Sequence, residues 1–174
     1  MVPSGYWWVN HKQTVGAERR GGYLWAPKTK RDGSRDETYE NLTRTARGDI
    51  VFSYASATVG AVGVVSGPWR EQRRPMEFGE AGQVWNPDGW MVPMTWVNLA
   101  APLVPAAHMD SIGPLLPPKY SPLQHNGRGN QGCYLAAIPE DLGKLVLELI
   151  ARSNPRAMAQ LVALVRRVLT GPDL

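Results

Sequence analysis

The 174-residue sequence predicts an α+β fold, a small, curved, mixed β-barrel flanked by helices and followed by a C-terminal helical tail. Short runs of β-branched and aromatic residues alternate with turn formers, a pattern typical of short strands. Gly60 and Gly63 interrupt one run, and glycines inside a strand favour the bulges and bends of a strongly curved sheet. After residue 139 the apolar spacing becomes helical.

The strand patterns occur at Tyr6–Asn10, Ile50–Ala55, 59–66, 91–99 and 133–138. Residues 36–46 predict a short helix, because Asp36 lies near its positive end and Arg44 near its negative end. Residues 23–25 form an apolar patch that places Trp25 in a loop setting. We expect residues 68–82 to form a loop and the proline-rich residues 100–118 to wrap the surface.

The length supports one domain with a tail rather than two independent domains. We expect residues 1–139 to form the barrel and residues 140–174 to form two helices that pack on it or link it to a partner. Leu142, Leu145 and Leu149 lie on one face of the first helix. Asn154 followed by Pro155 is typical of the start of a second helix.

Composition narrows the class of protein. Lys and Arg outnumber Asp and Glu by 19 to 15, and the pI near 9.4 weakly favours a polyanionic partner. Cys133 is the single cysteine, which excludes a disulfide framework and fits a reducing compartment, with core filling as its expected role. No apolar run reaches the roughly 20 residues of a membrane span, and the first residues do not resemble a signal peptide. We expect a cytoplasmic protein without a membrane partner.

Motifs for common catalytic sites are missing from the sequence. The three histidines, His11, His108 and His125, are scattered, which argues against a zinc site. There is no Gly-x-Ser-x-Gly nucleophile elbow, no Walker loop and no recognisable acidic cluster for two metals. The sequence therefore predicts a non-catalytic binding module without metal or cofactor.

Two tryptophans, Trp85 and Trp90, flank an Asn-Pro-Asp-Gly turn. Proline and glycine both favour a tight reversal, so the indoles are expected at its mouth. They either pack on the barrel or face a ligand, and the spacing relative to other aromatic residues favours the ligand. The remaining tryptophans, except Trp25, are assigned mainly to the core: Trp7, Trp8, Trp69 and Trp96.

The order of motifs resembles the EVE and YTH branch of the PUA-like superfamily, small β-barrels that recognise modified bases. The resemblance is closest to the EVE-like reader domain at the N-terminus of modification-dependent HNH restriction endonucleases. It rests on YWWVN at Tyr6–Asn10, GYLWAPK at 22–28, GDIVFSYA at 48–55 and YSPLQHNGRGNQGCYL at 120–135. No HNH segment follows, so the resemblance implies that a nuclease effector is absent, removed or supplied by another chain.

The more distant YTH resemblance implies roles for single residues. An aromatic cage for the base would consist of Trp25, Trp85 and Trp90, and the Asn126-Gly127-Arg128 segment is similar to one that contacts the phosphate backbone. The Lys-Ser end of the first YTH strand is replaced here by Asn10-His11-Lys12, so the base is not fixed by the resemblance.

A reader that encloses a base must flip it out of the duplex at a cost of a few kcal/mol, and stacking on aromatic faces offsets that cost. The side chains predicted to recognise the base edge are Asn10, Ser53, Tyr54, Asn130 and Gln131. Those predicted to contact phosphates, with solvated surface charge as the alternative, are Lys12, Lys28, Lys30, Arg31, Arg35, Arg70 and Arg128.

The leading hypothesis is a DNA reader of 5-methylcytosine or 5-hydroxymethylcytosine that targets a restriction or defence system. The choice of cytosine rests on the HNH-linked resemblance alone. The alternative is a reader of N6-methyladenine on DNA or RNA, as the YTH-like tryptophans imply. A further alternative is an accessory of RNA modification or a nuclease in its own right.

Overall fold

The computed structural model describes residues 5–172, so the outermost residues of the two predicted segments, 1–4 and 173–174, lie outside the described residues. Within this range one mixed sheet contains seven strands, in the order β2-β6-β4-β3-β1-β7, with β5 paired to β6. Only the β1–β3 pair is parallel among these strands. The strands are β1 Tyr6–Asn10, β2 Tyr23–Pro27, β3 Ile50–Ala55, β4 Thr58–Val65, β5 Arg70–Arg73, β6 Asp88–Leu103 and β7 Leu135–Ile138.

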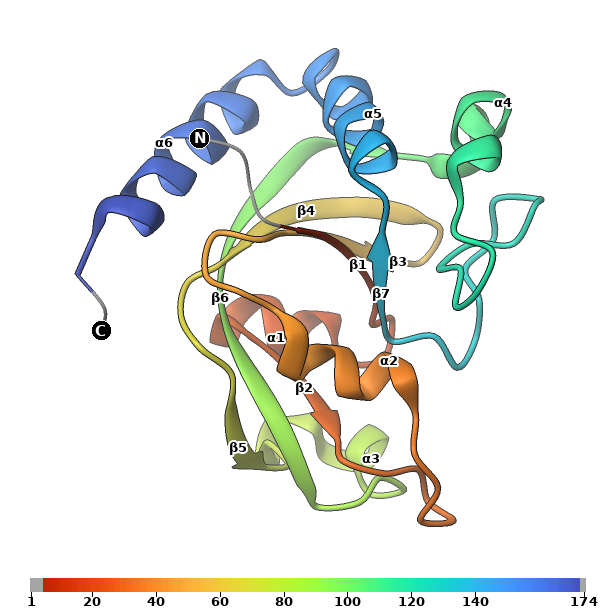
Figure 1. Ribbon diagram of the computed structural model, residues 1–174, viewed down its shortest axis with the longest axis vertical. Coiled ribbons are helices and arrows are strands. Elements are labelled where there is room, and N and C mark those ends of the chain that lie inside the picture. The colour runs from red at the N-terminus through yellow and green to blue at the C-terminus, as the bar shows by residue number, and fades with distance from the viewer. Residues whose placement is uncertain (1–4, 173–174) are drawn as a thin grey trace.

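The long strand β6 gives the sheet its curl. Its first part pairs with β2 and β5, and its second part pairs with β4, so it links the lower and upper parts of the sheet in Figure 1. Register shifts interrupt the β3–β4 and β4–β6 pairs. At Gly63 a Cβ atom would lie 2.5 Å from the Trp96 ring, so the missing side chain lets the indole cross the neighbouring strand. The predicted α+β fold with a curved, mixed sheet is confirmed.

Short helices lie between the strands along the chain, and two longer helices come after the last strand (Figure 1). Asp36 caps α2 by accepting a hydrogen bond of 2.8 Å from the Thr38 amide, as expected for a helix starting there. The α-helices are α1 Val15–Gly21, α2 Glu37–Glu40, α3 Gly79–Gly82, α4 Met109–Ile112, α5 Glu140–Ala151 and α6 Pro155–Thr170. The 3-10 turns are Asn41–Arg44, Met76–Phe78, Pro105–His108 and Gly113–Leu115.

The two faces of the sheet bury different cores. Trp8 and Phe52 belong to a large cluster that also contains Leu142 of α5 and Leu161 of α6. On the opposite face Trp7 packs in a second cluster with residues of β2 and β6. Alternation along β1 places the neighbouring tryptophans on opposite faces. Both helices of the predicted tail therefore cover one face of the sheet and share its core (Figure 1).

Several local predictions were wrong. Residues 23–25 lie in strand β2, not in a loop, because they pair with β6. Residues 68–82 contain β5, whose four residues are all exposed and so show no alternation of apolar side chains in the sequence. Trp69, assigned to the core, is 39% exposed. Helix α1, with the sequence VGAERRG, was not predicted, because it has no apolar stripe at the helical period.

No helix in the described range 5–172 has both the length and the apolar character needed to cross a membrane.

Candidate ligand-binding pocket

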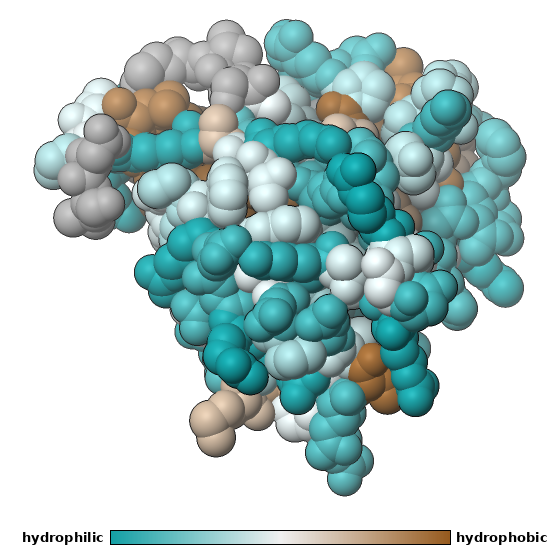
Figure 2. Space-filling model, turned by 60° about the horizontal axis from the view of Figure 1, so that its bottom comes forward, coloured by the Kyte–Doolittle hydropathy of each residue, from teal (hydrophilic) through white to brown (hydrophobic). Residues whose placement is uncertain are grey.

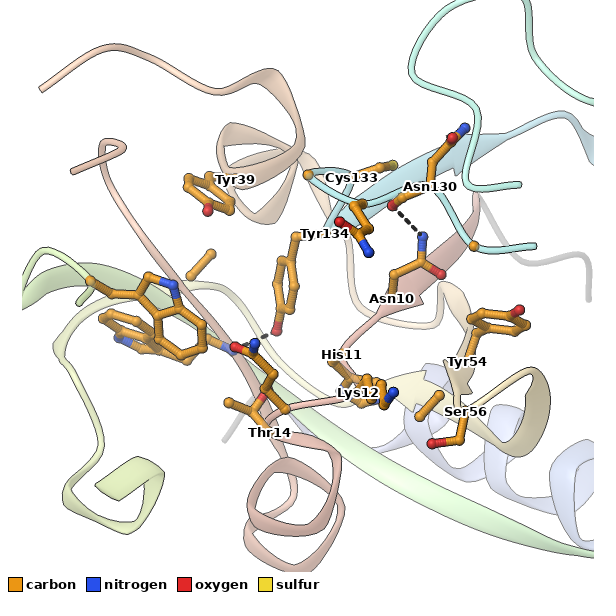
Figure 3. A pocket seen from close by; sticks show the side chains of 18 of the residues that line it. Asn10, His11, Lys12, Thr14, Tyr39, Tyr54, Ser56, Asn130, Cys133 and Tyr134 are labelled. Carbon is orange, nitrogen blue, oxygen red and sulfur yellow. Dashed lines mark hydrogen bonds between the residues drawn. The ribbon is translucent and has the colours of Figure 1, made fainter. Parts of the chain in front are cut away.

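A pocket of about 660 Å³ opens where β1 and β3 end and where the chain enters β7. Asn10 ends β1, Tyr54 lies near the end of β3, and Cys133 and Tyr134 directly precede β7. Figure 3 shows Tyr39 and Tyr134 on one side of the pocket and Tyr54 with Ser56 on the other. Because β1 lies between β3 and β7, the sheet order brings these distant parts of the sequence together.

The pocket has aromatic walls, which suit a flat ligand. Tyr39, Tyr54 and Tyr134 line it together with Trp25 and Trp85. The rings of Tyr39 and Tyr134 meet edge to face, with centroids 6.4 Å apart. Its volume lies within the range of small-molecule pockets, roughly 300–1,000 Å³. An aromatic ring system of the size of a nucleobase therefore has both space and stacking partners here.

Two of the three predicted cage tryptophans reach this pocket. Trp25 is only 2% exposed, since its ring packs against Phe78 and its Nε1 donates a hydrogen bond of 2.9 Å to the Gln72 carbonyl oxygen. Trp85 is half-buried and also packs edge-on against Phe78. Phe78 thus supports both indoles from behind, and Trp85 offers the larger accessible surface.

The third predicted tryptophan, Trp90, does not line this pocket, so the structure does not assemble the predicted cage. The reason is the register of the β2–β6 pair. Trp90 lies opposite Ala26, whereas Trp25 lies opposite Met91. Paired residues share a face and successive residues alternate, so Trp90 and Trp25 point to opposite faces of the sheet. Trp90 packs against the second core cluster instead.

A buried hydrogen-bond network centred on Glu18 holds the pocket wall. The Glu18 carboxylate is fully buried and accepts hydrogen bonds from Thr14 Oγ1 at 2.7 Å and from the Tyr134 hydroxyl at 2.7 Å. His11 Nδ1 lies 3.0 Å from the same carboxylate. The Tyr134 oxygen also accepts a hydrogen bond of 3.2 Å from the Trp25 amide. Burial first, and the charge of Glu18 next, raise the pKa of Tyr134, which keeps its hydroxyl protonated as a donor.

Ser53, predicted to contact the base edge, is fully buried and does not line the pocket. Its Oγ lies 2.6 Å from His11 Nε2 and accepts a hydrogen bond of 2.9 Å from Arg19 Nε. The order Ser53, His11, Glu18 resembles a hydrolase triad, but a nucleophile needs access to its substrate. With no exposed surface, Ser53 belongs to the structural network and does not reach a ligand in this conformation.

The predicted polar residues Asn10, Tyr54, Asn130 and Gln131 do line the pocket. Asn10 is already engaged: its Oδ1 accepts from Trp8 Nε1 at 3.1 Å, and its Nδ2 donates to the Pro122 carbonyl oxygen at 3.0 Å. Its side chain therefore fixes the neighbouring loop. Gln131 is exposed at the rim. The roles of these residues in recognising a base edge stay predictions.

Of the predicted phosphate contacts, Lys12 and Arg128 line the pocket and are exposed. The other five do not line it. Three of those five face carboxylates: Lys28 lies 2.6 Å from Glu71, Arg35 2.5 Å from Glu40 and Lys30 3.7 Å from Asp36. Arg31 and Arg70 are exposed elsewhere on the surface. The structure thus brings two predicted cations to the rim.

The surface at the lower end of the molecule is mainly hydrophilic. Figure 2 brings this end forward and shows isolated hydrophobic residues among polar ones, not one continuous apolar patch. Single exposed apolar side chains are ordinary on protein surfaces.

Sequence reasoning missed several pocket residues. Tyr39 packs against the second core cluster and also lines the pocket. Tyr134, His11 and Thr14 had no assigned role, although Tyr134 stands inside the motif at 120–135. Their function in the network depends on Glu18, which no local pattern connects to Tyr134, 116 positions away.

Cys133 is buried beside the pocket, and burial raises the pKa of its thiol to about 12. It is therefore a neutral thiol at physiological pH. Among residues 5–172, no three His, Cys, Asp or Glu side chains gather in a way that would hold a metal ion.

Comparison with solved structures identifies the fold. The YTH domain of Pho92, solved in complex with m6A, aligns with a TM-score of 0.57 and 12% identity over 86% of this chain and 89% of that chain. The YTH domain of Zygosaccharomyces rouxii MRB1, in complex with N6-methyladenosine RNA, aligns with a TM-score of 0.52 and 16% identity. This alignment covers 86% of this chain and 90% of that chain. A protein from Pseudomonas putida aligns with a TM-score of 0.55 and 12% identity, over 83% of this chain and 99% of that chain.

No protein-family model matches the chain, and no curated protein matches it. The structural likeness therefore shows the fold, a curled half-barrel sheet flanked by helices as in YTH domains.

Proposed function

We propose that this chain is a non-catalytic reader that binds nucleic acid and encloses one modified base in the pocket near the end of β1. The observation that carries the proposal is the pocket of about 660 Å³, whose walls are aromatic and whose rim holds Lys12 and Arg128. Aromatic faces stack on a base, and the two cations suit the phosphates on either side of it. The net charge of +4 also suits a polyanionic partner.

The site has to offset the free-energy cost of flipping the base out of its stack. Unstacking and unpairing a base costs a few kcal/mol, and each base–aromatic contact contributes roughly 1–3 kcal/mol. Trp85 offers an accessible face, and Tyr134 is held by Glu18 and the Trp25 amide. A wall that is rigid before binding loses little side-chain entropy when the base enters.

N6-methyladenine is the first modified base to test. Two structures of the same fold were solved with N6-methyladenosine or m6A, which supports this base better than the modified cytosines that the sequence favoured. Modified cytosine is the second candidate, because the four sequence motifs resemble reader domains linked to HNH restriction endonucleases. In that case the chain would act with a nuclease effector in a restriction or defence system.

The test is a binding panel of matched DNA and RNA oligonucleotides, single-stranded and duplex. Each carries N6-methyladenine, 5-methylcytosine, 5-hydroxymethylcytosine or no modification, and affinity is measured by fluorescence anisotropy at fixed salt. We expect tighter binding to one modified base than to its unmodified counterpart. Equal affinity for all ligands would rule out a reader.

Trp85→Ala is expected to lower affinity for the preferred ligand roughly 5- to 150-fold, because stacking of roughly 1–3 kcal/mol is lost. Trp69→Ala is the matched control: it removes an exposed tryptophan that does not line the pocket and should leave affinity unchanged. Circular dichroism checks that both variants fold. Equal losses in the two variants would contradict the assignment of the pocket.

A further inference from the structure

Tyr120 combines two unusual features. Its side chain is 57% exposed, and its backbone has φ of 53°, a conformation that bulky residues rarely adopt. The other non-glycine residues with positive φ in the described chain, Ser56 and Ala57, form the tight turn between β3 and β4, which requires such angles. Tyr120 lies in no such turn, so a tight hairpin does not explain its conformation.

The pocket itself holds this conformation in place. Three side chains that line the pocket donate hydrogen bonds to three consecutive carbonyl oxygens of the segment 120–122. Cys133 Sγ contacts the Tyr120 oxygen at 3.6 Å. The amides of Asn130 and Asn10 contact the Ser121 and Pro122 oxygens at 2.7 and 3.0 Å. Figure 3 shows Asn10, Asn130 and Cys133 together on this side of the pocket. The backbone of the segment is therefore fixed to the pocket wall while its aromatic ring stays exposed.

The surroundings of Tyr120 suit the chain of a nucleic acid. A second hollow of about 610 Å³ borders the segment: Pro118 and Ser121 line it, and it shares Asn130 with the pocket. Lys119 next to Tyr120 is exposed, and Arg128 lies at the pocket rim. An exposed ring with cations nearby is the combination that binds a base together with its phosphates.

We propose that Tyr120 is a stacking platform for the base next to the enclosed one in the same strand. The inference rests on the proposed reader function. A strand that delivers one base into the pocket must place the adjacent nucleotides at the rim, where the pocket residues hold segment 120–122. Stacking on an aromatic ring tolerates every base, so the platform adds affinity with little preference for the flanking sequence.

A double-mutant cycle tests the platform. The protein arms are the wild type, Tyr120→Ala and Tyr120→Phe. The ligand arms are the preferred modified oligonucleotide, the same oligonucleotide with an abasic site on either side of the modified base, and the modified nucleoside alone. We expect Tyr120→Ala to weaken oligonucleotide binding roughly 5- to 150-fold, about 1–3 kcal/mol, and to leave nucleoside binding unchanged. Tyr120→Phe should bind like the wild type.

The cycle separates the possible outcomes. An abasic site beside the modified base should lower the affinity of the wild type but cause no further loss of affinity in Tyr120→Ala. This result would show that the Tyr120 ring and the neighbouring base stack on each other. Additive losses, or an unchanged affinity of Tyr120→Ala, would overturn the platform while the reader function stands. If the wild type prefers no modified ligand, the reader function fails and the platform with it.

Tyr120→Gly separates binding from folding. Glycine adopts φ of 53° readily, so the thermal midpoint should not fall below that of the wild type, whereas oligonucleotide affinity should fall as in Tyr120→Ala. A large drop in the midpoint would show that the ring supports the fold, which contradicts a role as an exposed platform.

Discussion

At the scale of single residues, the pocket depends on buried polar atoms that bond to one another within its wall. Tyr134 presents its ring to the pocket, but its position is set by its hydroxyl, which donates to Glu18 and accepts from the Trp25 amide. Glu18 itself is fully buried and needs these donors, because a buried carboxylate without partners is costly. The position of the pocket wall therefore depends on the hydrogen bonds between Tyr134, Glu18 and Trp25.

Tyr134→Phe is expected to destabilise the protein by about 1–3 kcal/mol. The phenylalanine keeps the ring but leaves buried groups of Glu18 and Trp25 with one partner fewer. Urea unfolding followed by circular dichroism measures the change. Tyr39→Phe is the matched control, since Tyr39 lines the same pocket and its hydroxyl takes no part in the Glu18 network. A loss of the same size in both variants would contradict the role of the hydroxyl.

At the scale of elements, the pairing of β6 with β2 determines how closely Trp25 packs on its neighbouring strand. Gly89 of β6 lies opposite Pro27 of β2, and the Trp25 ring covers it. A Cβ at Gly89 would lie 2.3 Å from Trp25 Cζ2 and 2.5 Å from the Ala26 carbonyl oxygen. Gly89, between Trp85 and Trp90, is therefore required by the Trp25 ring on the neighbouring strand β2 and not only by the turn.

Gly89→Ala is expected to cost about 1–3 kcal/mol, the usual range for overpacking, because the Trp25 ring and the backbone of β2 must both move. Thermal unfolding measures the loss. Gly16→Ala is the control: the nearest atom would be 3.5 Å away, and alanine favours helix α1, so its midpoint should stay equal or rise. If Gly89→Ala also keeps its midpoint, the close packing of Trp25 on β6 is wrong.

The sequence predicted those elements whose own pattern decides their structure. Strands β1, β3 and β4 are runs rich in β-branched, aromatic and other apolar residues, and helices α5 and α6 have apolar residues at the helical period. Strands β2 and β5 exist through pairing with β6, which no local pattern reveals. The site follows the same rule. The pocket is lined, as predicted, by Trp85, Asn10, Lys12 and Arg128. The prediction for Trp90 was wrong, because the face on which it lies depends on the register between β6 and β2.

At the scale of the whole molecule, the C-terminal helices and the sheet form one hydrophobic core. Leu161 of α6 is 3% exposed and belongs to the same cluster as Trp8 of β1, while the neighbouring Val162 is 48% exposed. The residues 140–172 described here therefore act as a cover for one face of the sheet.

Leu161→Asp is expected to unfold the protein or to cost more than about 3 kcal/mol, because it buries a charge without a partner. Val162→Asp introduces the same residue one position later in the same helix and should change stability by less than about 0.5 kcal/mol. Denaturant unfolding and size-exclusion chromatography distinguish the two. If both variants stay folded with equal stability, residues 140–174 are dispensable for the barrel.

The place of β1 between β3 and β7 also governs when the protein can fold. Tyr6 pairs with Ile138, which follows it by 138 − 6 = 132 positions. At a synthesis rate of about 5–20 residues per second, roughly 7–26 s pass on the ribosome between these two residues. During this interval one edge of β1 lacks its final neighbour and is open to pairing with other chains. Among the described strands β1 thus waits longest for its final neighbour, so chaperone protection of the nascent chain is most valuable at this strand.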